Sequence, residues 1–216
     1  MIEQKHLVVP FLKTNEKTVL TETSGQLDAV QRHSISFVPW KAYSYKPEVE
    51  FAIGYSDYAL LLKFFVSEKE VKAIYAKPND PVYKDSCVEL FISFEDEKEY
   101  YNFEFNCAGT CLLGFGKERN ERLQLSDELI GRIRYQSVLK PSNCPEANIS
   151  WELTLEIPLD VFHFHQIKTL KNKRARANVY KCGDDLLQPH FLAWNEIETE
   201  APDFHRPEFF GSIEFS

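Results

Sequence analysis

Short runs of β-branched and aromatic residues recur along the chain and are separated by turn residues, a rhythm typical of all-β proteins. Helical periodicity is scarce, and short helical turns are expected near residues 126–131 and 158–164. Such runs predict strands at residues 49–55, 58–68, 72–77, 87–95, 100–107, 110–116, 131–139, 149–158, 174–182 and 208–215. They favour an antiparallel two-sheet β-sandwich of the jelly-roll or immunoglobulin-like type. A chain of 216 residues is expected to form one domain over residues 1–216.

The charge balance and the cysteines limit the partners and the compartment. Lys and Arg total 25 against 33 Asp and Glu, and a net charge of -8 disfavours nucleic acid as a partner. Apolar runs are too short for a membrane helix, so no membrane partner is expected. Five cysteines form an odd set without a disulfide framework, which favours a reducing, cytoplasmic location. Oligomeric state stays open.

Two adjacent predicted strands carry polar residues at alternating positions. Glu89 lies at the start of the first strand, just after a loop that contains Tyr83. In the second strand alternation places three polar side chains on the same face: Asn102, Glu104 and Asn106. If the two strands are neighbours, these carboxylates and amides form a row suited to binding hydroxyl groups.

Three segments, taken in order, resemble the family 9 carbohydrate-binding modules and their relatives in the DOMON-like superfamily. They are "YKDSCVELFISF" (83–94), "YYNFEFNCAG" (100–109) and "FHRPEFFG" (204–211), and the resemblance extends from about Trp40 to the end of the chain. It implies a β-sandwich that holds a sugar ring between two aromatic side chains, without catalysis. Tyr83 matches the first of these rings.

The resemblance also implies roles for residues near the C-terminus. Phe204 matches the second aromatic position, with Trp194 as a rival for that role. His205 and Arg206 would complete the wall of the ligand site, and Glu89 matches the carboxylate that accepts from sugar hydroxyls. The expected partner is a mono- or oligosaccharide.

Two other functions stay open at this stage. Family binders place an arginine where this chain has Glu104, so Glu89 and Glu104 could instead serve as the acid and base, or nucleophile, of a glycoside hydrolase. A haem or redox domain is the third possibility, although Met1 is the only methionine, which disfavours a Met–His axial pair. His190 is expected to be a hydrogen-bonded buried histidine.

No cofactor is expected except a structural calcium ion, which the resemblance implies. The loop before residue 87 offers suitable hard oxygen ligands in Asn79, Asp80 and Asp85. The same residues are also those of an ordinary turn, so both interpretations stay open.

Overall fold

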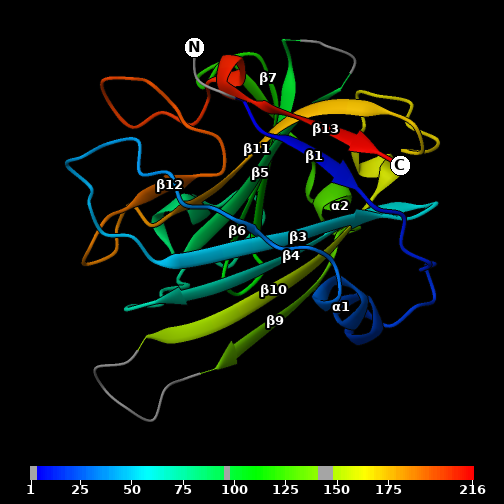
Figure 1. Cartoon of the computed structure of the whole chain (residues 1–216), viewed down its shortest axis with the longest axis horizontal. Coiled ribbons are helices and arrows are strands. Elements are labelled where there is room, and N and C mark those ends of the chain that lie inside the picture. The colour runs from blue at the N-terminus through cyan, green and yellow to red at the C-terminus, as the bar shows by residue number, and fades with distance from the viewer. Residues whose placement is uncertain (1–3, 95–97, 141–147) are drawn as a thin grey trace.

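The computed structural model describes residues 4–94, 98–140 and 148–216 and consists of two packed β-sheets (Figure 1). The large sheet has the order β1 (His6–Val9), β13 (Gly211–Phe215), β11 (Arg174–Cys182), β5 (Cys87–Phe94), β6 (Tyr100–Asn106), β7 (Cys111–Gly116) and β8 (Arg122–Gln124), and β12 (Phe191–Ala193) also pairs with β11. The small sheet has the order β2 (His33–Ser34), β3 (Glu48–Tyr55), β4 (Ala59–Glu68), β10 (Ile149–Pro158) and β9 (Arg134–Lys140). Neighbouring strands are antiparallel except for β1 and β13, which are parallel.

Helical structure is limited to short segments among the described residues: α1 (Leu20–Asp28), α2 (Asp127–Ile130) and the 3-10 turns η1 (Val82–Lys84), η2 (Leu159–Val161) and η3 (Pro207–Phe209). The prediction of a β-sandwich is confirmed. The predicted strand at 72–77 is wrong, because the backbone N–H groups of Ile74 and Tyr75 donate to the Asp85 carboxylate instead of to a strand. Residue 95, predicted to end a strand, lies outside the described residues.

The main core lies between the two sheets. Alternation along each strand turns one set of side chains inward, so that Leu90 of β5, Phe103 of β6 and Leu155 of β10 are almost completely buried there. Burial of each such side chain contributes about 1.5–3 kcal/mol relative to leaving it in water. The central strands of the large sheet are thereby fixed, and with them the direction in which their outward side chains point.

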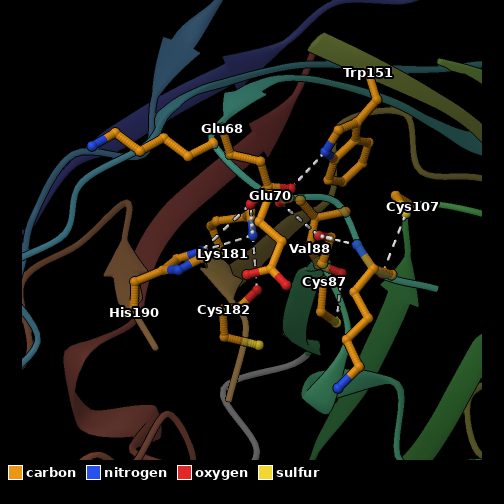
Figure 2. A network of polar contacts seen from close by, with 12 residues as sticks. Glu68, Glu70, Cys87, Val88, Cys107, Trp151, Lys181, Cys182 and His190 are labelled. Atoms are coloured by element: carbon orange, nitrogen blue, oxygen red, sulfur yellow. Dashed lines mark hydrogen bonds and ion pairs between the residues drawn. The ribbon is translucent and has the colours of Figure 1, made fainter. Parts of the chain in front are cut away.

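A buried ion pair crosses this core and joins the sheets (Figure 2). The Lys181 ammonium of β11 lies 2.8 Å from the Glu68 carboxylate of β4, and both side chains are fully buried. Glu68 also accepts a hydrogen bond of 2.7 Å from the Trp151 indole, while Lys181 donates to His190 Nε2 at 2.8 Å. His190 is thus a hydrogen-bonded buried histidine, as predicted.

His190 is expected to make the protein sensitive to acid. Burial, and then the charge of Lys181, lower the pKa of His190 to about 3. Its remaining neighbours are Glu68, at 3.7 Å, the Tyr45 ring and the Gln188 carbonyl oxygen. The pKa of His190 in the folded state lies below the ordinary value of about 6.5. The contribution of the neutral imidazole to the free energy of unfolding is therefore complete above about pH 6.5 and is lost as pH falls toward 3.

The predicted loss attributable to His190 is about 2 kcal/mol of unfolding free energy between pH 8 and pH 5. Urea unfolding at both pH values measures it, and His190→Gln should reduce the difference because glutamine does not titrate. An equal pH dependence in wild type and variant would contradict this role.

Helix α1 covers the outer face of the small sheet. Thr23 donates a 2.6 Å hydrogen bond to the buried carboxylate of Glu156, and Leu27 packs against apolar residues of β3 and β4. Asp28, at the end of the helix, accepts a hydrogen bond from the buried Lys63 ammonium. The segment is poor in strong helix formers, so tertiary packing rather than intrinsic propensity stabilises it.

Candidate functional site

The outward side chains of the large sheet are covered by loops rather than exposed to water. Phe91 of β5, Tyr100 of β6 and Tyr180 of β11 form a second apolar cluster there, together with Trp40 and Phe210. The sheet is therefore buried on both faces along its middle strands, which explains why β5 is completely buried. The polar residues on this face are enclosed with the rings, not presented to solvent as a wet surface.

The predicted polar row exists and is formed by neighbouring strands. β5 and β6 are paired, and Glu89 is directly opposite Glu104 in the register. Side chains opposite one another in an antiparallel pair have Cβ atoms about 4.5–5.5 Å apart. Asn102, two residues along, donates a 2.8 Å hydrogen bond to Glu104.

This row forms the floor of a cavity of about 700 Å³. The cavity is walled by the loop before β5, the segment leading into β8 and the chain that precedes η3. Six residues predicted from the sequence line it: Tyr83, Glu89, Asn102, Glu104, Phe204 and His205. Residues that are far apart in sequence thus meet at one site on the outer face of the large sheet.

Three residues predicted for the binding surface lie elsewhere. Trp194 is 3% exposed and packs edge-on against Phe51. Its side chain belongs to the core between the sheets and does not face the cavity. Asn106 is fully buried and donates to the Tyr75 carbonyl, holding the loop before β5. Arg206 forms an ion pair with Glu208, two residues along the chain, and does not line the cavity.

The walls also contain residues that sequence reasoning missed: Tyr43, Arg119, Asn120, Arg122, Asp184, Phe191 and Asp203. Arg122 is the most firmly held of them. Its guanidinium donates to Asn102 Oδ1 at 2.7 Å and to the Tyr100 carbonyl at 2.7 Å, and lies over the Tyr100 ring. It lies in the three-residue strand β8, which is too short to give an alternation signal.

Two aromatic arrangements border the cavity. The Phe204 ring stacks on Tyr180 with centroids 4.1 Å apart and an angle of 7°, and the Tyr180 hydroxyl donates to the Phe204 carbonyl. Phe204 is therefore fixed in place, with one ring face covered by Tyr180, and the residue is only 9% exposed. Tyr43 and Phe191 are half-buried and meet edge-to-face at 4.8 Å.

Burial dominates the electrostatics of the floor. It raises the pKa of both Glu89 and Glu104, and the charge of Glu104 raises the pKa of Glu89 further. Hydrogen bonding from Asn102 and the charge of Arg122 act in the opposite direction on Glu104. A raised pKa favours the protonated form, and a protonated carboxyl group can donate to a hydroxyl group as well as accept from one.

Burial and two neighbouring arginines also keep His205 neutral. The Nδ1 atom of its ring lies 2.9 Å from the Tyr100 hydroxyl, and the ring packs against Phe91. Burial, followed by the charges of Arg122 and Arg119, lowers its pKa to about 3. A neutral imidazole at this wall acts as a polar surface rather than as a cation.

The three residues predicted to bind calcium hold the turn in which they lie. Asp85 Oδ2 accepts hydrogen bonds from the backbone N–H groups of Ile74 and Tyr75, and Asp80 Oδ2 accepts from those of Ala76 and Lys77. The Asn79 side-chain amide donates to the Leu125 carbonyl oxygen, just after β8, and accepts from the Leu113 N–H group in β7. Asp85 Oδ2 also accepts from the Asn106 amide of β6. Calcium binding here stays a prediction, which a chelator effect on thermal melting would test.

A β-sandwich with a loop-walled cavity on one sheet, lined by aromatic rings, carboxylates and amides, defines a module that binds small polar ligands. The chain belongs to carbohydrate-binding family 9, whose model matches residues 22–215. The resemblance to the family 9 modules is thereby confirmed. A comparison with curated proteins finds no match.

Solved structures support the same assignment. A candidate carbohydrate-binding protein from Bacteroides uniformis is 36% identical, with 99% of this chain and 100% of that chain covered and a TM-score of 0.89. Two structures of a family 9 module from Caldicellulosiruptor kristjanssonii, in complex with cellotriose and with glucose, are each 12% identical. They cover 98% of this chain and 94% and 96% of theirs, with TM-scores of 0.61 and 0.58, and share the fold. No helix among the described residues is long and apolar enough to span a membrane.

Proposed function

We propose that this chain binds a mono- or oligosaccharide in the cavity on its large sheet, without catalysing a reaction. The observation that carries the proposal is that Tyr83, Phe204 and the Glu89–Glu104 pair meet at one cavity although they are distant in sequence. The family assignment supports it, as do the cellotriose and glucose complexes of modules with the same fold.

The chemistry of the lining suits a sugar ring. An aromatic face carries negative charge density and attracts the slightly positive C–H groups of a pyranose, while burying apolar ring surface. In the proposed mode one face of the sugar packs on Tyr83, and the other packs against the wall that contains Phe204 and Phe191. Hydroxyl groups at the ring edge then reach the floor, where Glu89 and Glu104 lie.

The family assignment favours binding over hydrolysis by the two glutamates. Glu89 and Glu104 lie side by side on adjacent strands, at the floor of the cavity. This geometry offers two hydrogen-bonding groups to one part of a ligand.

Replacing Tyr83 with alanine tests the proposal most directly. Tyr83 is half-buried at the cavity wall, so its removal should weaken binding of glucose or cellotriose at least about tenfold, which corresponds to 1.4 kcal/mol. Thermal melting should change less than in a variant of a fully buried ring, because Tyr83 is only half-buried where it packs against the second apolar cluster. Isothermal titration calorimetry with millimolar sugar is suited to the micromolar to millimolar affinity expected for such a site.

The matched control is Tyr135→Ala, which removes a tyrosine that is 50% exposed and lies outside the cavity. Its affinity for sugar should equal that of wild type. A wild-type protein that binds neither sugar nor any member of a glycan array, or equal losses in the two variants, would contradict the proposed site.

A further inference from the structure

Two buried thiols and a carboxylate converge beneath the cavity. Cys87 of β5 and Cys182 of β11 are directly opposite in the register of the paired strands, and Figure 2 shows both below the buried ion pair. Glu89 follows Cys87 on the same face of β5, two residues along. One ligand atom from each of the three residues lies within 4.8 Å of the other two.

Contacts within this group are already polar. The Cys182 thiol donates to Glu89 Oε1 at 3.1 Å, and the Cys87 sulfur lies 4.0 Å from the same oxygen. All three side chains are at most 3% exposed. Glu89 and Cys182 line the cavity, so the group is enclosed by protein on one side and open to the cavity on the other.

Further carboxyl groups lie close to this point, in a cavity that Arg119 and Arg122 also line. Glu104 lies opposite Glu89, and its Oε2 atom is buried without a hydrogen-bond partner. Asp184 also lines the cavity. A cation at the thiol–carboxylate group would interact favourably with these carboxyl groups.

We propose that Cys87, Glu89 and Cys182 form a binding site for a thiophilic divalent metal ion, of which zinc is the best match. Two thiolates and a carboxylate are three of the four ligands of a tetrahedral zinc site, and the fourth position would face the cavity. On binding, the two thiols lose their protons to solvent and each sulfur forms a bond to the metal. Sulfur ligands discriminate against calcium and magnesium, which prefer oxygen alone.

An open fourth position links the metal to the proposed carbohydrate site. In zinc sites with three protein ligands that position holds water or a substrate atom. Here it would be open to a hydroxyl group of a ligand in the cavity, because Glu89 and Cys182 both line that space. The metal site itself rests on the thiols and the carboxylate and does not require that a sugar binds.

Cobalt(II) is the probe for this proposal, because bonds from thiolates to cobalt give a charge-transfer absorption band. Reduced, chelator-treated protein should bind one equivalent of Co²⁺ with this band, and Zn²⁺ should abolish the band by displacing cobalt. Cys182→Ser should lose the band. The control is Cys111→Ser, which alters another buried, free cysteine whose sulfur lies outside the group.

The outcomes separate cleanly. Absence of the thiolate–cobalt band in the wild type would overturn the proposal. An undiminished band in Cys182→Ser would also overturn it, because the metal would then be bound by other cysteines. Loss of all metal binding because Cys87 and Cys182 form a disulfide in reducing buffer would also overturn it. Should circular dichroism show Cys182→Ser to be unfolded, Glu89→Gln decides: at least tenfold weaker Co²⁺ binding supports the site, and unchanged binding opposes it. Glucose titration of the same metal-free sample reports on carbohydrate binding independently.

Discussion

The variant Lys181→Met is expected to lose about 3–5 kcal/mol of unfolding free energy, because it leaves the Glu68 carboxylate buried without its cation. The 2.8 Å pair lies between the sheets, where neither side chain contacts water. The variant also removes the hydrogen bond that Lys181 donates to His190. Urea unfolding monitored by tryptophan fluorescence measures the change.

A second substitution distinguishes a lost ion pair from damage to packing. In Lys181→Met combined with Glu68→Gln the uncompensated charge is gone, and the glutamine oxygen can still accept from the Trp151 indole. The double variant should therefore be more stable than Lys181→Met alone. Lys171→Met, at an exposed position, should change stability by no more than about 0.5 kcal/mol. A loss below about 1 kcal/mol in Lys181→Met would show that the pair contributes little.

Phe210→Ala is expected to cost about 3–5 kcal/mol of stability and to weaken sugar binding as well. The ring is fully buried and packs edge-on against Tyr100 with centroids 5.3 Å apart. Tyr100 in turn lies beneath the Arg122 guanidinium, which lines the cavity. A void at residue 210 is thus transmitted to the cavity wall through two direct contacts.

Thermal melting and calorimetry on the same sample test both parts of this expectation. Phe11→Ala is the comparison, since that ring is 44% exposed and its removal should cost clearly less stability and leave sugar affinity unchanged. Full stability in Phe210→Ala would contradict the assignment of the ring to the second cluster. Full sugar affinity in a destabilised variant would show that the wall does not depend on it.

Strand alternation predicted the floor of the site because it fixes which side chains share a face. Glu89 and Glu104 were placed correctly for this reason, and the pairing of β5 with β6 then brought them together. The same reasoning could not separate the two possible positions of an aromatic residue near the C-terminus. Trp194 and Phe204 both suit a ring position, yet Trp194 faces the core between the sheets.

Residues on loops were predicted less well, because a loop's path depends on contacts that no local pattern records. Tyr43 comes from the connection between β2 and β3, and Phe191 begins the three-residue strand β12, so that their meeting at the cavity follows from how these segments fold over the sheet. Arg206 shows the reverse error. The Arg206 guanidinium has donors suited to sugar hydroxyl groups, but they form hydrogen bonds to the carboxylate of Glu208, two residues along the chain.

The stack of Phe204 on Tyr180 has a thermodynamic consequence for any guest of the cavity. Tyr180 of β11 already holds the Phe204 ring in one orientation before a ligand binds. Ligand binding therefore costs little side-chain entropy at Phe204. Selectivity then depends on the shape of a preformed cavity wall, and the ligand-free and ligand-bound structures should superimpose closely at Phe204.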